Sequence, residues 1–230
     1  MTCRSNTYNT FKGFDVEKIH DVDYDQEYVD VILNHINFIT GNESDYLIKW
    51  LANIIQQPAK LSRTAIVLKT LEGLGKNYFL SFFGEIIGKD YYYSVADATN
   101  RLFSRFNGKR ADKLLINLDE ANHKDTKAFY EILKAEITND VISIEQKGLD
   151  VREIRNFTGW IFTTNNELPV PLSKTQRRFV LLESKKKRPN KEYFMKLGKV
   201  FDSNIGKYSF YKYLKEQVEK LILVLMLSQD

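Results

Sequence analysis

The sequence predicts an α/β fold in which a parallel central sheet follows a helical segment and precedes further helices. Two continuous apolar runs of strand length, residues 64–68 and 114–118, are each followed by residues at helical spacing. Such runs are typical of strands that are buried on both faces, as in a parallel sheet. We expect an N-terminal helical segment at 1–60, the α/β core at 61–187 and a C-terminal helical segment at 188–230.

The composition is that of a folded domain, with 43% hydrophobic and 28% charged residues among 230. The formal net charge of +4 is too small by itself to indicate a nucleic-acid partner. A single cysteine, Cys3, excludes an internal disulfide and a multi-cysteine metal site. We expect a cytoplasmic protein with no membrane contact, because the first residues are polar and the apolar run 221–227 is shorter than the ~20 residues of a span.

Helical spacing occurs twice within residues 26–58 and predicts a helical hairpin that Pro58 ends. After residues 141–145, where apolar and polar residues alternate, a Lys-Gly pair predicts a turn. In chain order, the other predicted elements are helix 79–86 with Gly88 as its C-cap, helix 129–137, a β-hairpin over 141–155, strands 159–164 and 179–182, and helices from residue 191 onward.

A glycine-rich loop joins the first strand to the next helix. Residues 70–77 read Thr-Leu-Glu-Gly-Leu-Gly-Lys-Asn, close to the phosphate-loop pattern G-x-x-x-x-G-K-[ST]. Glycines let backbone N–H groups surround the phosphates of ATP, and the lysine neutralises their oxygens. A turn that binds no nucleotide is the alternative. The expected nucleotide-binding residues are Gly73, Leu74, Gly75, Lys76 and Asn77.

The loop departs from the pattern at two positions. Thr70 occupies the first glycine position, and Asn77 replaces the Ser or Thr whose hydroxyl binds Mg²⁺. An amide oxygen can still reach the metal directly or through water, so Asn77 remains a candidate metal ligand.

Two carboxylates, Asp119 and Glu120, end the second buried strand. Ligands of open α/β sheets bind at this edge, and the pair resembles a Walker B motif. Asp119 would belong to the Mg²⁺ shell, and Glu120 would orient and deprotonate the attacking water. The alternative is an ordinary acidic turn before a helix. The upstream phosphate loop makes the catalytic interpretation the stronger one.

Polar residues at two later strand ends complete the expected site. Asn165 follows the strand at 159–164 and suits a sensor of the terminal phosphate, although a simple turn is the alternative. Arg177 and Arg178 precede the last strand and could include an arginine finger that acts on a neighbouring subunit. A solvated basic pair is the alternative, and the sequence does not decide between the two arginines.

The predicted β-hairpin carries basic residues. Lys147 lies at its turn and Arg152 on its return arm, where they could follow the phosphate backbone of single-stranded DNA. A charged, exposed hairpin without a ligand is the alternative. The denser basic run at 185–188 is interpreted as solvated surface.

The order of these motifs resembles the superfamily 3 helicase domain of phage and poxvirus-type primase-helicases. The shared elements, within about residues 9–197, are the phosphate loop, the Leu-Asp-Glu strand end, Leu-Lys-x-x-Ile-Thr at 133–138, Glu-x-Lys-Gly at 145–148, Thr-Thr-Asn and Arg-Arg. The resemblance implies an AAA+-related P-loop NTPase fold and an ATP- and Mg²⁺-dependent DNA helicase in viral, phage or mobile-element replication. It also implies a hexameric ring on single-stranded DNA, and a primase or polymerase module on another chain or missing from this one.

Carried over by position, the resemblance assigns phosphate binding to Lys76, metal and water to Asp119 and Glu120, sensing to Asn165 and DNA contact to Lys147. It makes Arg177 or Arg178 the finger. Two alternatives stay open. One is another P-loop NTPase such as a small-molecule kinase, although kinases lack the hairpin-then-sensor order. The other is a non-hydrolysing DNA-binding ring subunit, which the unusual residues of the phosphate loop make plausible.

Overall fold

The computed structural model describes residues 9–96, 102–103, 107–120, 129–165 and 177–218, and it confirms the predicted α/β class. Five parallel strands form one sheet in the order β2-β3-β6-β1-β7. The strands are β1 (Ala65–Thr70), β2 (Tyr92–Val95), β3 (Leu115–Leu118), β4 (Val141–Ile144), β5 (Arg152–Arg155), β6 (Gly159–Thr164) and β7 (Phe179–Ser184). The helices are α1 (Gln26–Thr40), α2 (Ser44–Gln56), α3 (Lys76–Ile87), α6 (Tyr130–Thr138), α7 (Lys191–Phe201) and α8 (Asn204–Lys212), with short turns η1 (Asp15–Lys18), η2 (Gly108–Arg110) and η3 (Tyr213–Gln217).

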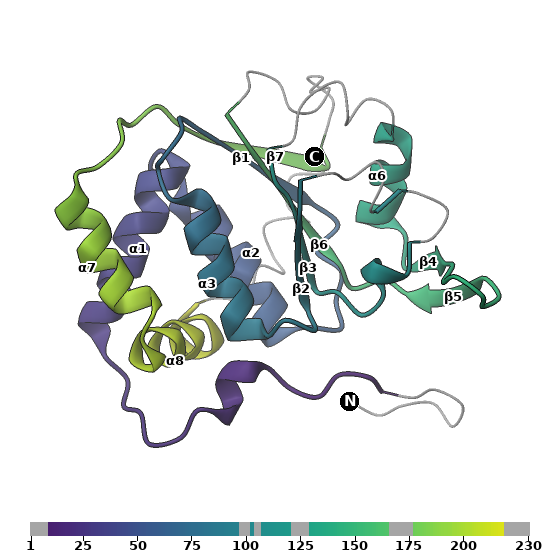
Figure 1. Cartoon of the computed structure of the whole chain (residues 1–230), viewed down its shortest axis with the longest axis horizontal. Helices are drawn as coiled ribbons and strands as arrows, with labels where there is room; N and C mark the ends of the chain where they lie inside the picture. The colour runs from purple at the N-terminus through teal and green to yellow at the C-terminus, as the bar shows by residue number, and fades with distance from the viewer. Residues whose placement is uncertain (1–8, 97–101, 104–106, 121–128, 166–176, 219–230) are drawn as a thin grey trace, which may run out of the picture.

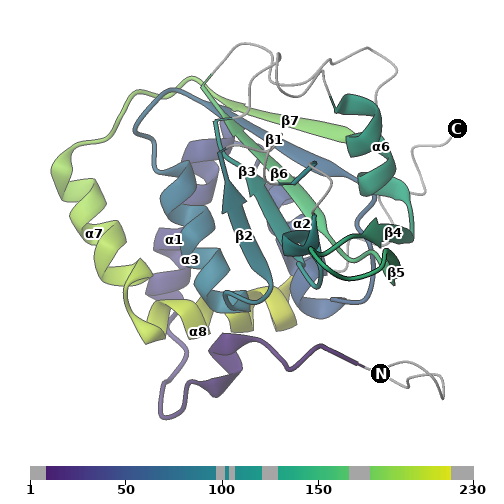
Figure 2. The same ribbon diagram turned by 45° about the vertical axis from the view of Figure 1, so that its right-hand side comes forward.

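Helices cover both faces of the sheet, which is why nearly every residue of its central strands is buried (Figures 1 and 2). Helices α1, α2, α3, α7 and α8 share the larger core with one face, and Trp50 and Phe79 are fully buried there. Helix α6 covers the other face around Trp160 and Phe162. All three expected segments thus contribute to a common apolar core.

The helices end where local sequence stops them. Asp25 caps α1 by accepting hydrogen bonds from the backbone N–H groups of Glu27 at 2.8 Å and Tyr28 at 3.3 Å. Gly41 ends the same helix in the left-handed conformation. Gly88 ends α3, as the sequence predicts. Helix α7 packs on α3 through stacked rings of Phe82 and Phe201, whose centroids are 4.3 Å apart.

The predicted β-hairpin is present, with β4 and β5 paired antiparallel beside α6 (Figure 1). Gly148 takes the left-handed conformation at its turn, with φ 80°. Asn107, which the sequence did not single out, anchors the hairpin. Its side chain accepts from the N–H of Glu145 at 2.8 Å and donates to the carbonyl of Ser143 at 3.1 Å. The hairpin is therefore fixed where β4 runs into the turn, while residues 147–150 of the turn are exposed.

Strand β2 is an element that the sequence pattern did not reveal. The apolar run 221–227 and Cys3 lie outside the described residues. Among the helices that the structure describes, none has both the length and the apolar character to cross a bilayer.

Candidate nucleotide-binding site

The carboxyl ends of three strands lie at one edge of the sheet. Strands β1, β3 and β6 are parallel neighbours, so the segments that leave their carboxyl ends emerge side by side (Figure 2). These segments carry the phosphate loop, the acidic pair and Asn165. The topology thus brings together the groups that the sequence placed at separate strand ends.

Lys76 is the first residue of α3 and only 8% exposed. Its Nζ donates a hydrogen bond to Oδ1 of Asn165, which joins the phosphate loop to the predicted sensor. Burial lowers the pKa of Lys76, while the negative charges of Asp119, Glu120 and Glu72 oppose that shift. The ammonium is thus held among negative groups at the edge where a triphosphate would enter.

Asn77 and Asp119 form a second contact across the same edge. Nδ2 of Asn77 donates to Oδ1 of Asp119 at 2.6 Å, and the hydroxyl of Thr163 donates to the same oxygen at 2.9 Å. Oδ1 of Asn77 is buried and has no hydrogen-bond partner among the residues described. A buried acceptor without a donor beside a carboxylate fits an oxygen-preferring cation such as Mg²⁺.

The described residues contain no group of three or more His, Cys, Asp and Glu side chains arranged to hold a metal. At nucleotide sites Mg²⁺ takes one or two protein ligands, here Asp119 and Asn77, together with phosphate oxygens and water. The residues present therefore fit a metal that arrives with its nucleotide.

The phosphate loop depends on glycine for its course. Gly73 and Gly75 have φ values of 72° and 90°, which side chains rarely adopt. A Cβ on Gly75 would also come within 3.0 Å of His35 and 3.2 Å of Phe194. Leu74, which lies between the two glycines, is buried in the core. Its side chain anchors the loop, while the backbone of the loop stays at the surface.

His35 supports the loop from α1, a role that the sequence did not predict. Its Nε2 lies 3.4 Å from the carbonyl oxygen of Gly75 and its Nδ1 lies 2.8 Å from the hydroxyl of Tyr193. Burial lowers the pKa of His35 to about 4, although the Gly75 contact opposes the shift. A neutral imidazole can donate to Gly75 and accept from Tyr193, so it connects α1, α7 and the loop.

Thr163 was also missed, although a signal for it exists. It lies two residues before Asn165, and residues two apart point to the same side of a strand. Glu120 is exposed at the same edge, with φ 53° in the left-handed region. Asp119 is half-buried and in hydrogen-bonded contact, so the two carboxylates of the pair occupy different environments.

The arginine pair lies elsewhere. Arg177 and Arg178 precede β7, and the carbonyl of Arg178 accepts from the N–H of Ala65 at 2.7 Å, where β1 begins. They therefore lie at the amino edge of the sheet, a strand length away from the phosphate loop of the same chain. Arg177 is exposed and Arg178 half-buried. The structure does not bring either arginine to the site formed by Lys76.

The basic hairpin residues are also separate from this site. Lys147 and Arg152 are exposed on the hairpin, which extends beside α6 (Figure 1). The structure thus separates the expected residues into three groups: the carboxyl edge, the amino edge and the hairpin.

Comparison with known proteins identifies relatives. The sequence matches a family of unknown function (DUF5906) over residues 68–178, which extend from the end of β1 to the arginine pair. It is 28% identical over 178 residues to the DNA primase-polymerase of Nitratiruptor phage NrS-1. The chain is a homologue of this phage protein. The match includes 76% of this chain and 24% of the primase-polymerase, so the chain spans about a quarter of its relative.

Solved structures of the C-terminal region of the same phage protein share the fold. Two apo structures each superpose with a TM-score of 0.69 at 21% identity, covering 92% of this chain and 56% of theirs. The expected resemblance to a phage primase-polymerase is therefore confirmed in sequence, and the fold is that of the C-terminal region of this relative. The expected parallel α/β architecture is confirmed as well.

Proposed function

We propose that this chain is an ATP-hydrolysing motor of the superfamily 3 helicase type, which moves along single-stranded DNA during phage or viral genome replication in the host cytoplasm. The observation that carries the proposal is the hydrogen-bonded group at the carboxyl edge. There Lys76 contacts Asn165, and Asn77 and Thr163 both contact Asp119. Sequence-distant groups with the chemistry of a phosphate site converge at the edge where α/β folds bind ligands.

Each member of this group has a role in the proposed reaction. The backbone of 73–77 and Lys76 bind the phosphates, and Asn77 with Asp119 would hold Mg²⁺, which neutralises charge on the β- and γ-phosphate oxygens. Glu120 is exposed at the same edge and accepts the proton of the attacking water. A γ-phosphate would compete with Asn165 for the ammonium of Lys76, which releases Asn165 to orient that water.

The arginine pair requires a second subunit. Because Arg177 is exposed at the amino edge, it cannot reach the phosphate loop of its own chain, but it can reach that of a neighbour across an interface. An arginine supplied in this way stabilises the negative charge of phosphoryl transfer. We therefore propose a homo-oligomeric ring, hexameric by analogy, with each site completed by Arg177. Arg178 is half-buried and therefore less accessible to a neighbour than Arg177.

The hairpin is the proposed DNA contact. Lys147 is exposed beside Gly148, whose surroundings are open within 4 Å, and Arg152 lies on the return arm. Positive side chains on an anchored hairpin can follow a phosphate backbone without recognising the nucleobases. The exposed Leu149 and Val151, 63% and 60% accessible, add apolar surface for bases or sugars. A primase or polymerase module on another chain is the proposed partner.

The experiment is a titration of ATP turnover against protein concentration, with and without single-stranded DNA. The proposal expects turnover to rise with both, and a strand-displacement assay to show unwinding. Full activity in a dilute monomer without DNA would contradict it and favour another P-loop NTPase, such as a kinase.

A non-hydrolysing DNA-binding ring subunit is the second candidate. It is favoured by the amide of Asn77, which donates to Asp119 at 2.6 Å where a metal-binding hydroxyl is usual. DNA binding and ring assembly without ATP turnover would support this candidate.

A further inference from the structure

The basic run at 185–188 leaves the sheet beside the phosphate loop. Strands β1 and β7 are parallel, and Ser184 at the end of β7 pairs with Thr70 at the end of β1. The two segments that follow therefore run along the same edge. Four residues beyond Ser184, the side chain of Arg188 lies against Gly73. A Cβ on that glycine would come within 2.9 Å of Cδ and 3.1 Å of Nε of Arg188.

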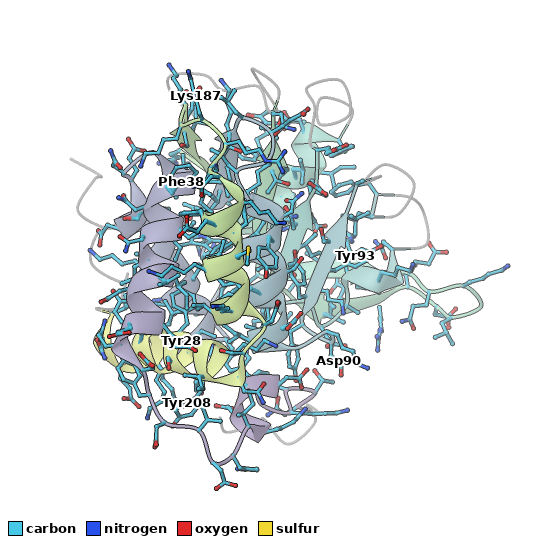
Figure 3. All side chains as sticks on the ribbon, turned by 60° about the vertical axis from the view of Figure 1, so that its left-hand side comes forward. Tyr28, Phe38, Asp90, Tyr93, Lys187 and Tyr208 are labelled. Carbon is cyan, nitrogen blue, oxygen red and sulfur yellow. The ribbon has the colours of Figure 1, made fainter. Side chains whose placement is uncertain are left out.

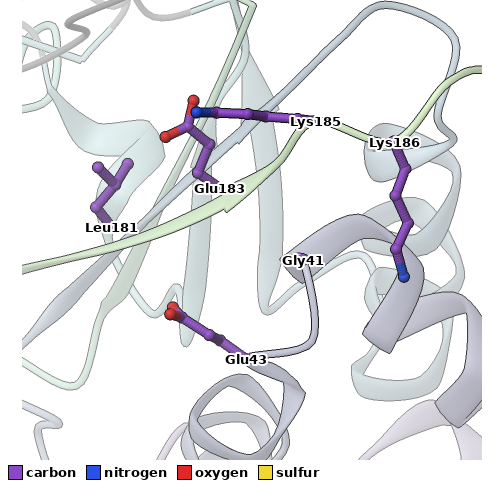
Figure 4. A pocket seen from close by; sticks show the side chains of 6 residues that line it. All are labelled: Gly41, Glu43, Leu181, Glu183, Lys185 and Lys186. Carbon is purple, nitrogen blue, oxygen red and sulfur yellow. The ribbon is translucent and has the colours of Figure 1, made fainter.

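The three lysines of the run are placed differently. Lys186 donates to Oδ1 of Asn42 at 3.1 Å and lies over the ring of Phe38, 5.3 Å from its centroid. Lys185 belongs to an open pocket with Glu183, on the side of β7 that faces the α1–α2 loop (Figure 4). Lys187 is exposed and projects outward at this end of the molecule (Figure 3). Arg188, by contrast, lies against Gly73 of the phosphate loop.

The guanidinium of Arg188 is available for a ligand. The residue is exposed, and within the described parts of the chain no carboxylate pairs with it. By contrast, Lys69 on β1 pairs with Glu183 at 3.0 Å. The stem of Arg188 lies against the glycine-rich loop, and none of its five N–H donors is bonded to a residue that the structure describes. Arg188 thus places a basic group beside the loop whose successive backbone N–H groups would face a phosphate.

We propose that Arg188 binds the triphosphate of the nucleotide held by its own phosphate loop. This inference rests on the proposed function. A guanidinium can donate two parallel hydrogen bonds to phosphate oxygens, which a lysine cannot do. Lys76 would then contact the triphosphate from the start of α3, and Arg188 from the segment that follows β7. Replacing Gly73 by any other residue would displace Arg188 from this position.

The position of Arg188 also links the nucleotide to the C-terminal helices. Two residues later Asn190 caps α7, accepting from the N–H of Tyr193 at 2.9 Å. Helix α7 packs into the larger core through Leu197 and Phe201, and Phe194 of the same helix contacts Gly75. Arg188 and Phe194 thus both place the start of α7 beside the phosphate loop of the same chain.

Equilibrium binding of a fluorescent ATP analogue tests the assignment. We expect Arg188→Ala to raise the Kd about tenfold, since a hydrogen bond between charged groups is lost. Arg188→Lys keeps the charge but loses the two parallel N–H donors of the guanidinium, so its Kd should rise about threefold. Lys187→Ala removes the same charge from the adjacent residue and should change the Kd less than about twofold. The defect should be larger for ATP than for AMP.

Measurement at a protein concentration where the chain is monomeric separates this role from that of Arg177. A defect that persists in the monomer supports binding within one chain, and a defect confined to the assembled ring overturns it. Equal Kd values for Arg188→Ala and Lys187→Ala, with ATP bound by the wild type, overturn the inference and leave the proposed function standing. Absence of nucleotide binding by the wild type overturns both.

Discussion

The two edges of the central sheet differ in how far they bring the predicted site residues into contact. At the carboxyl edge, Lys76, Asn77 and Asp119 are wholly or partly buried and hydrogen-bonded to one another or to neighbouring polar groups. At the amino edge, Arg177 is exposed and lies a strand length from that group. The carboxyl edge therefore has its polar groups already in contact within the chain, whereas the amino edge exposes a cation to other molecules. Under the proposed function, each chain would supply the carboxyl edge of one site and Arg177 to the site of a neighbouring chain.

The largest effect is expected at the carboxyl edge. Lys76→Ala removes the ammonium that neutralises phosphate oxygens, and we expect ATP turnover to fall about 10³-fold or more. Phosphate release at saturating ATP measures it. Lys69→Ala, which removes a lysine of β1 that is paired with Glu183, is the control and should retain most of the turnover. Similar losses in both variants would count against the assignment.

The next effect tests the amino edge. Arg177→Ala should lower turnover about 10³-fold while leaving ATP binding by the monomer unchanged, because the arginine acts on the neighbouring subunit. Mixing the variant with wild-type chains should reduce turnover below the weighted average of the two. Arg178→Ala is the matched comparison, and a smaller loss is expected because Arg178 is half-buried whereas Arg177 is exposed. If the Arg177→Ala monomer lost ATP binding, Arg177 would contribute to the site of its own chain, and the proposed difference between the two edges would be wrong.

A smaller effect is expected at the hairpin, which belongs to neither edge. Lys147→Ala should weaken binding of single-stranded DNA several-fold and reduce the salt slope by about one charge per contacting subunit. Binding measured from low to physiological salt shows this. Because Lys147 is exposed on the hairpin and separate from the phosphate loop, ATP turnover without DNA should stay unchanged. An unchanged salt slope would remove Lys147 from the DNA path.

The smallest effect concerns His35, which supports the phosphate loop. Its pKa is about 4 when folded and about 6.5 when unfolded, so the unfolded chain binds more protons between these values. Its contribution to stability is present above pH 6.5 and is lost as the pH falls towards 4. Between pH 7 and 5 the loss should be about 2 kcal/mol.

Denaturant unfolding at the two pH values measures this contribution. In the variant His35→Gln the pH-dependent loss should shrink by the same amount, whereas His20→Gln, at an exposed histidine, should behave as the wild type. An identical pH dependence in His35→Gln and wild type would show that the imidazole does not stay neutral beside Gly75.

Sequence reasoning predicted much of the fold because strong local patterns coincide with real elements. The buried strands β1, β3 and β6, the helix after the phosphate loop and the β-hairpin lie where periodicity placed them. Strand β2 was missed, since Tyr92–Val95 is short and becomes a strand through its pairing with β3. Asn107 was missed for a similar reason, because its role depends on two backbone groups of β4 and the adjoining turn.

The sequence alone determined which groups could bind phosphate, and at which strand ends they lie. Parallel strands direct their carboxyl ends to one edge, so Lys76, Asp119 and Asn165 had to approach one another once the strands were recognised. Only the tertiary structure decided that His35 and Arg188 reach the same loop and that Arg177 does not. Those contacts depend on how helices and strand ends pack across long separations in the chain. Local periodicity carries no information about that packing.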